Sequence, residues 1–239
     1  MKQAPDNRLI SGCCDGSIKI WDRESGKCIR TINEHTETVK DILFESNDKF
    51  IASSVDESIK CFDLNNFNCI WNIDANARSC DLTSNNKLIF CDHLDTIQVW
   101  DTNTCTCLKT IECSALCVIV ISDKLIASGS EINEIIIWNI ESGTRLQTLQ
   151  GNNDDEYYMF GVYCIIKLSD EQIASCTYDE TIKIWNINSG QCLKIFHVAT
   201  EIFSLNKLSD TQIISSAEQK IQVWDIQTGK CTKIIDEIK

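Results

Sequence analysis

Cysteine, histidine and acidic side chains are the residues of this chain that could bind a metal ion or catalyse a reaction. The 239 residues include 15 cysteines, three histidines and 35 acidic residues. The densest thiol groups are Cys13-Cys14 and Cys105-Thr106-Cys107. Neither has the gap of about two to four residues that separates paired zinc ligands, and no second pair with a matching spacing accompanies them. We therefore expect no metal site.

The histidines do not suggest a catalytic group. His35, His93 and His197 lie far apart in the sequence, and none has the His-x-x-x-His spacing or an adjacent nucleophile. The chain also lacks a glycine-rich phosphate-binding loop. We expect a protein that is not an enzyme and that needs no cofactor.

Charge and composition exclude several classes of partner. The 22 basic residues against 35 acidic ones give a net charge of -13, which opposes binding to a phosphate backbone, so nucleic acid is not an expected partner. No segment approaches the roughly 18 consecutive apolar residues of a membrane span, and no apolar signal segment follows Met1. Without a basic cluster for nuclear import, we expect a cytoplasmic protein with no membrane partner.

An internal repeat reveals the elements that carry these residues. The segment from Ser17 to Asp22, which reads Ser-Ile-Lys-Ile-Trp-Asp, recurs five more times in related form at intervals of 38 to 47 residues. We call the aromatic residue near the end of each copy its landmark aromatic. The six landmark aromatics are Trp21, Phe62, Trp100, Trp138, Trp185 and Trp224.

Each copy has the pattern of short β-strands. Aliphatic residues stand three and one before the landmark aromatic, usually with a polar residue between them, which is the two-residue period of a strand. A glycine follows five residues later in four copies, where a hairpin turn would need positive φ. These glycines are Gly26, Gly143, Gly190 and Gly229. One apolar run follows the turn and two more precede the landmark, so each repeat predicts four short strands.

Four strands per repeat, with Trp-Asp or Trp-Asn closing the third, resemble the WD-repeat (Gβ-like) β-propeller family over nearly the whole chain. The resemblance implies an all-β propeller of six blades, each of four antiparallel strands, with the first strand at the central channel and the last at the rim. We expect a single domain over residues 1–239. Its expected blades span about 8–32, 38–73, 78–111, 115–149, 161–196 and 201–235.

The first blade departs from the family pattern. Only seven residues precede Arg8, and they show no apolar run, so we expect this blade to lack its inner strand. A missing inner strand would leave backbone groups unpaired. Two interpretations remain open: the chain is a fragment of a larger propeller, or it is a six-blade ring with one thin blade.

The hydrogen-bond network typical of the family is incomplete in this sequence. The family builds it from a His before the first strand, an Asp in the turn before the third, and the landmark Trp. Asp15, Asp56 and Asp179 occupy the Asp position, and only His35 occupies the His position. The repeat of His35 has Phe62 as its landmark, so no blade holds all three residues. We expect stability to rest mainly on apolar packing between blades.

Most cysteines fit the repeat. Five of them stand seven residues after a landmark aromatic, at the start of the fourth strand of separate blades: Cys28, Cys69, Cys107, Cys192 and Cys231. In a propeller, equivalent positions of successive blades are far apart, so these thiols cannot pair with one another or share a metal ion. We expect them to serve as small buried apolar residues.

The resemblance also predicts an acidic face. Loops between blades and loops between second and third strands would share one face, and about half of the 35 acidic residues map there. An acidic face attracts basic protein segments, although it can equally be a solvated surface. The longest loop, between Gly151 and Gly161, adds three acids and three aromatic residues that could contact a partner or pack beneath the loop. These residues are Asp154, Asp155, Glu156, Tyr157, Tyr158 and Phe160.

We therefore predict a non-catalytic scaffold that binds a basic protein or peptide through its acidic loop face. The candidate contacts are the six loop residues with Asp56 and Asp179, and the structural residues are the landmark aromatics with His35 and Asp15. The alternative is the substrate-recognition module of a ubiquitin ligase complex. Against its phosphopeptide-reading form, the five arginines are scattered over several blades.

Overall fold

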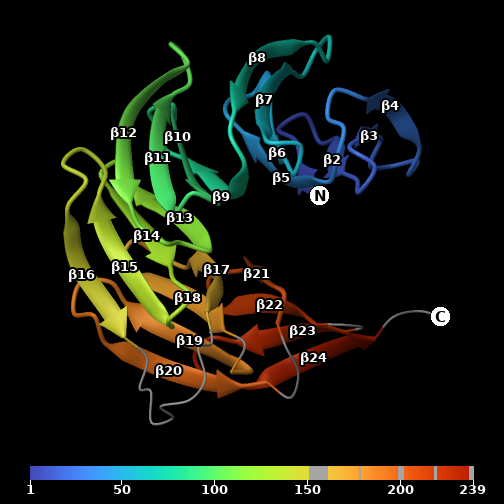
Figure 1. Cartoon of the computed structure of the whole chain (residues 1–239). Coiled ribbons are helices and arrows are strands. Elements are labelled where there is room, and N and C mark those ends of the chain that lie inside the picture. The colour runs from blue at the N-terminus through green and yellow to red at the C-terminus, as the bar shows by residue number, and fades with distance from the viewer. Residues whose placement is uncertain (151–160, 178, 199–201, 218–219, 237–239) are drawn as a thin grey trace. The chain divides into compact units, whose positions relative to one another are not determined.

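The chain folds into six four-stranded antiparallel sheets, each of which is a propeller blade (Figure 1). The computed structural model describes residues 1–150, 161–177, 179–198, 202–217 and 220–236. In every sheet the strands are paired in chain order, so each blade is a meander. The prediction of an all-β fold with six propeller blades is confirmed. Across the described ranges, no helix has the length and apolarity that crossing a membrane requires.

The blades fall into two compact units, which we describe separately. The first unit, Met1–Glu112, holds blades 1 to 3, and the second, Cys113–Lys239, holds blades 4 to 6. The strands of the first unit are β1 (Lys2–Gln3), β2 (Leu9–Gly12), β3 (Ile18–Trp21), β4 (Cys28–Ile32), β5 (Val39–Phe44), β6 (Lys49–Ser54), β7 (Ser58–Asp63), β8 (Cys69–Asp74), β9 (Ala77–Leu82), β10 (Lys87–Asp92), β11 (Thr96–Asp101) and β12 (Thr106–Glu112). The strands of the second unit are β13 (Cys117–Ser122), β14 (Leu125–Gly129), β15 (Glu134–Asn139), β16 (Arg145–Gln150), β17 (Val162–Lys167), β18 (Gln172–Thr177), β19 (Thr181–Asn186), β20 (Cys192–His197), β21 (Ser204–Lys207), β22 (Gln212–Ala217), β23 (Lys220–Asp225) and β24 (Cys231–Asp236).

The first blade has an inner strand, so the expectation that it lacks one is wrong. Strand β1 pairs antiparallel with β2 through Lys2 and Gln3. The chain turns between the two strands, where the N–H of Ala4 donates to the carbonyl of Arg8 at 2.8 Å. A strand of two residues is held by backbone hydrogen bonds and shows no alternation of apolar and polar side chains, which is why the sequence pattern missed it.

The turn after each third strand uses positive φ, as the glycines predict. Gly26, Gly143, Gly190 and Gly229 have φ between 66° and 74°. In the two blades that lack this glycine, Phe67 and Cys105 adopt φ of 63° and 53° at the same position. The turn geometry is therefore a property of the repeat. In two blades a non-glycine residue adopts the left-handed backbone conformation, which is strained for a residue with a side chain.

Within each unit, neighbouring blades pack through apolar faces. The face that we call trailing carries an aliphatic pair on the third and fourth strands, such as Ile18 and Ile32 of blade 1. The next blade meets it with its leading face, which carries the landmark aromatic and its partner on the second strand. In blade 2 these are Phe62 and Phe50, whose rings stack at 5.1 Å. All four side chains are at most 6% exposed. The fold is thus held by successive trailing and leading faces.

The rim cysteines are not buried, which corrects the sequence expectation. All fifteen cysteines are free thiols, but Cys28, Cys69, Cys107 and Cys192 are exposed and Cys231 is partly exposed. They lie at the start of the outermost strand, where no further strand covers them. Each thiol instead donates to the carbonyl two residues further along, at 3.4 to 3.6 Å. Burial of thiols occurs at inner positions such as Cys61, Cys80 and Cys176.

Candidate functional site

The long loop that the sequence favours as a contact site lies outside the described residues. This applies to Asp154, Asp155, Glu156, Tyr157, Tyr158 and Phe160. Their part in binding stays a prediction. The remaining candidates, Asp56 and Asp179, are described and lie in loops between second and third strands.

Asp56 organises the turn before β7. Its carboxylate accepts hydrogen bonds from Nδ1 of His35 at 3.0 Å, from the N–H of Thr36 at 2.9 Å and from the hydroxyl of Ser58 at 2.6 Å. Burial raises the pKa of Asp56, but these hydrogen bonds outweigh it and lower the pKa to about 2. The side chain is 8% exposed. Asp56 is therefore an anionic anchor inside the blade, and its contact with a partner stays a prediction.

Asp179 has the same internal role in blade 5. Its carboxylate accepts hydrogen bonds from the hydroxyls of Thr177 and Thr181. It also forms an ion pair with Nζ of Lys183 at 2.9 Å. Burial raises the pKa of Asp179, but the two hydroxyl groups and the Lys183 ammonium outweigh burial and lower the pKa. Asp15 holds the turn of blade 1 in the same way, through the N–H and the hydroxyl of Ser17.

His35 completes the network of blade 2. The Asp56 carboxylate can only accept, so Nδ1 of His35 carries the proton that it donates. Its Nε2 is buried with no hydrogen-bond partner, and its ring meets Phe62 edge-on at 6.2 Å. Burial lowers the pKa of His35, and the nearby Asp56 only partly opposes this. The histidine is thus a neutral structural residue and not a catalytic base.

The landmark tryptophans are anchored by a partner that the sequence reasoning missed. In four blades the indole N–H donates to a serine hydroxyl on the second strand, at 2.8 to 2.9 Å; these serines are Ser11, Ser128, Ser175 and Ser215. In blade 3 the indole of Trp100 instead donates to the side-chain oxygen of Gln98. The signal was present in the sequence, since each of these serines stands nine or ten residues before its tryptophan.

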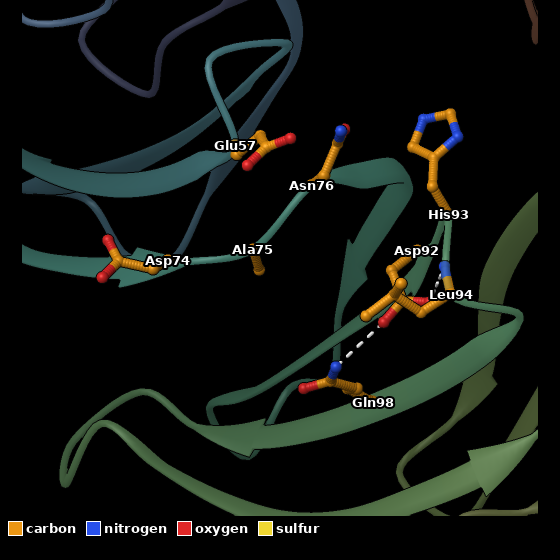
Figure 2. A pocket seen from close by; sticks show the side chains of 8 residues that line it. All are labelled: Glu57, Asp74, Ala75, Asn76, Asp92, His93, Leu94 and Gln98. Carbon is orange, nitrogen blue, oxygen red and sulfur yellow. Dashed lines mark hydrogen bonds between the residues drawn. The ribbon is translucent and has the colours of Figure 1, made fainter.

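A pocket of about 300 Å³ opens between blades 2 and 3 on the predicted acidic loop face. Figure 2 shows its lining residues, which come from the β6–β7 loop, from the end of β8 and the connection to the next blade, and from the end of β10, the β10–β11 loop and β11. They are Glu57, Asp74, Ala75, Asn76, Asp92, His93, Leu94 and Gln98. The loop types that the resemblance assigns to one face thus do meet at one site within the first unit.

Asp92 is the structural carboxylate of this pocket. It accepts hydrogen bonds from the N–H of Leu94 and the side-chain amide of Gln98 (Figure 2). It also accepts hydrogen bonds from the N–H and the hydroxyl of Thr96. Burial raises its pKa, but the hydrogen bonds outweigh burial and lower it. Asp92 has the structural role of the family's turn Asp, but it stands two residues earlier in its repeat than Asp56 does in its own. For this reason the sequence spacing alone did not identify it.

Two other carboxylates of the pocket belong to exposed residues, Glu57 and Asp74. Glu57 has a backbone φ of 63°, and Asp74 accepts a hydrogen bond from the side-chain amide of Asn72 at 2.9 Å. The side-chain oxygen of Asn76 is buried without a hydrogen-bond partner. Leu94 lines the same pocket and is 82% exposed. A pocket lined by exposed carboxylates and an apolar side chain suits a cationic side chain with an aliphatic stem.

The pocket holds no catalytic pair. Nδ1 of His93 accepts a hydrogen bond from Nε of Arg78 at 3.2 Å. Partial burial lowers the pKa of His93, and the positive charges of Arg78 and Lys40 lower it further. His93 is neutral near pH 7 with one ring nitrogen occupied by Arg78. Within the ranges that the structure describes, no three His, Cys, Asp or Glu side chains gather as a metal ion requires.

Comparison with known proteins identifies the repeats. A family model described as "WD domain, G-beta repeat" matches residues 1–22, 26–63 and 143–186. Over 62 residues, 26% of this chain, the sequence is 39% identical to Mitochondrial division protein 1 of Neurospora crassa, of which the match covers 9%. It is 35% identical to Eukaryotic translation initiation factor 3 subunit I of Anopheles gambiae over 28% of this chain and 21% of that protein.

A third relative gives the same picture. The chain is 40% identical to Nuclear distribution protein PAC1 of Arthroderma otae over 22% of its own length and 11% of the relative. The matched segments thus cover about a fifth or less of each of these relatives. The likeness concerns the repeat itself.

Proposed function

Because this chain is a member of the WD-repeat family, we propose that it is a protein-binding scaffold whose acidic loop face receives basic side chains of a protein or peptide. WD-repeat propellers are in general non-catalytic interaction scaffolds. The observation that carries the proposal is the pocket between blades 2 and 3, which is lined by Glu57, Asp74 and the exposed Leu94.

Charge and shape both favour a basic ligand at this pocket. With a net charge of -13 the chain attracts cationic segments over a distance set by the salt concentration, about 10 Å at 0.1 M. A lysine or arginine can lay its aliphatic stem on Leu94 and direct its charge to the carboxylates. Ala75 donates its N–H to the carbonyl of Glu57 at 2.8 Å, which fixes the connection between the blades against the β6–β7 loop.

An array of synthetic peptides tests the proposal. Peptides that contain lysine and arginine are compared with copies in which these residues are glutamine, and the Kd of the strongest binder is measured by fluorescence anisotropy. The double variant Glu57→Gln, Asp74→Asn should weaken binding about 5- to 30-fold, which corresponds to the loss of about 1–2 kcal/mol of charged hydrogen bonding. Raising the salt concentration should weaken wild-type binding in the same direction.

A charge-matched control separates the pocket from the general charge of the chain. Glu24 and Glu141 are exposed and lie in loops between third and fourth strands, outside the predicted acidic face. The variant Glu24→Gln, Glu141→Gln removes the same two charges and should leave Kd within about twofold. Equal weakening by both double variants, or binding that ignores the basic residues, contradicts the proposal for this pocket.

The long loop is tested separately. Tyr158→Ala with Phe160→Ala should weaken binding further if the loop contacts the same ligand. Recovery of cullin and RING subunits in a pull-down with the wild-type chain would instead favour the alternative of a ligase substrate-recognition module.

A further inference from the structure

Two cysteines of blade 5 lie directly opposite each other in its sheet. Cys164 on β17 is the register partner of Cys176 on β18. Residues directly opposite each other in an antiparallel pair have Cα atoms about 4.5 or 5.5 Å apart. Both spacings lie within the range of about 4.4–6.8 Å that a disulfide bridges. The backbone therefore holds these two thiols at a spacing that suits a disulfide.

A register shift in the sheet creates this pairing. Val162 lies opposite Thr177, and the register then shifts before Cys164. Without the shift, Tyr163 would lie opposite Cys176, and the side chain of Cys164 would lie on the other face of the sheet. The pairing thus depends on the fold of the sheet, and the spacing of the two cysteines in the sequence does not reveal it.

The two thiols share one apolar environment between blades 5 and 6, but they differ in exposure. Cys176 is fully buried in the cluster that includes Ile182 and Ile213, and the partly exposed Cys164 packs against this cluster. The side-chain hydrogen bond with Cys164 and burial both raise the pKa of the Cys176 thiol. Cys176 therefore stays protonated and shielded, and Cys164 is the thiol of this pair that a small oxidant in solution can reach.

Both sulfur atoms also contact the backbone at the start of blade 6. The N–H of Leu205 on β21 donates to Sγ of Cys164 at 3.4 Å, and Sγ of Cys176 donates to the carbonyl of Ile202 at 3.9 Å. A third thiol, Cys117 of blade 4, instead packs in the cluster between blades 4 and 5. The contacts with blade 6 thus place the sulfur atoms of Cys164 and Cys176 on the same side of the blade 5 sheet.

We propose that Cys164 and Cys176 form a reversible oxidation site at which a peroxide converts the two thiols into a disulfide. The sulfur of Cys164 attacks one peroxide oxygen, the O–O bond breaks, and the departing oxygen takes up the Cys164 proton to give water or an alcohol. The sulfur of Cys176 then attacks the sulfur of the resulting sulfenic acid. The S–O bond breaks, and the hydroxyl group leaves with the Cys176 proton as water. The two thiols are oxidised and the peroxide is reduced.

Mass spectrometry of the full chain tests the site. Trypsin cleaves after Arg145, Lys167 and Lys183, so Cys164 and Cys176 fall in separate peptides, 146–167 and 168–183, that contain no other cysteine. The chain is reduced, freed of reductant, treated with hydrogen peroxide, blocked with N-ethylmaleimide and digested without reduction. We expect these two peptides to be linked, and dithiothreitol to separate them.

Substitutions of single cysteines separate this site from general thiol oxidation. Cys164→Ser and Cys176→Ala should abolish the link, and circular dichroism checks that both variants fold. In Cys176→Ala, dimedone should trap Cys164 as a sulfenic acid, because alanine cannot complete the disulfide. The controls Cys192→Ser, which removes an exposed rim thiol of the same blade, and Cys117→Ser should form the link at a rate within about twofold of the wild type.

Two results overturn the proposal. One is a wild-type chain whose exposed rim thiols are oxidised by peroxide while the peptides 146–167 and 168–183 stay unlinked. The other is a chain in which Cys164 or Cys176 is linked mainly to another cysteine, such as Cys117.

Discussion

The Asp56→Asn variant should lose stability in a pH-dependent way that follows from the network around His35. The wild-type carboxylate is 8% exposed and accepts hydrogen bonds from His35, Thr36 and Ser58. Burial alone would raise its pKa, yet the hydrogen bonds lower the pKa from 3.8 to about 2. At 1.36 kcal/mol per pKa unit, the ionised Asp56 contributes about 2 kcal/mol to the free energy of unfolding at pH 7.

The direction of the pH dependence follows from the depressed pKa. Because the folded-state pKa lies below the unfolded value, the stabilisation is fully present above pH 3.8 and is lost as the pH falls toward 2. About half of it should remain at pH 3. Asparagine at position 56 has no charge to lose, so the difference in unfolding free energy between wild type and Asp56→Asn should shrink over this same window.

Urea unfolding followed by tryptophan fluorescence at pH 7, 5 and 3 measures the difference. Asp15→Asn is the matched control, since Asp15 holds the equivalent turn of blade 1 with only Ser17 as its hydrogen-bonding partner and has an exposed carboxylate. It should cost less than Asp56→Asn at pH 7. A difference that is the same at pH 7 and pH 3, or an equal loss in the two variants, would refute the reasoning.

Two further substitutions test the repeat chemistry. Ser128→Ala should destabilise the chain by about 1–3 kcal/mol, because it leaves the buried indole N–H of Trp138 without its partner at 2.8 Å; Ser11→Ala, beside the less buried Trp21, should cost less in the same urea titration. Cys105→Gly should raise the melting temperature, with a gain of about 0.5–1 kcal/mol, because residue 105 has φ of 53° where four other blades have glycine; a lower melting temperature would contradict this.

The repeat pattern predicted much of the fold. Alternation of apolar residues before each landmark aromatic and the glycines five residues after it are local features, and strands and hairpin turns respond to local features. The same reasoning missed β1, which is too short to show alternation. It also wrongly placed the rim thiols, such as Cys28, in the interior. A strand pattern in the sequence does not show whether a neighbouring strand covers a given side chain.

The candidate site was predictable only in outline. Family resemblance assigned the loops to one face, and Asp56 and Asp179 to their turns. It did not show that both carboxylates are occupied by internal hydrogen bonds, nor that Glu57, Asp74 and Leu94 line one pocket. The pocket, and the contacts of His35 and Thr36 with Asp56, join groups that lie far apart in the sequence.

The sequence by itself determined the repeat, the strand period, the turn chemistry and the acidic charge, since each is carried by neighbouring residues. Only the tertiary structure decided which of the side chains at equivalent positions of the repeat are buried. Lys60 and Lys183 occupy the same position of the same pattern, yet Lys183 is 5% exposed and forms an ion pair with Asp179, whereas Lys60 is partly exposed. Burial is a property of what packs against a residue, and a repeat pattern does not specify it.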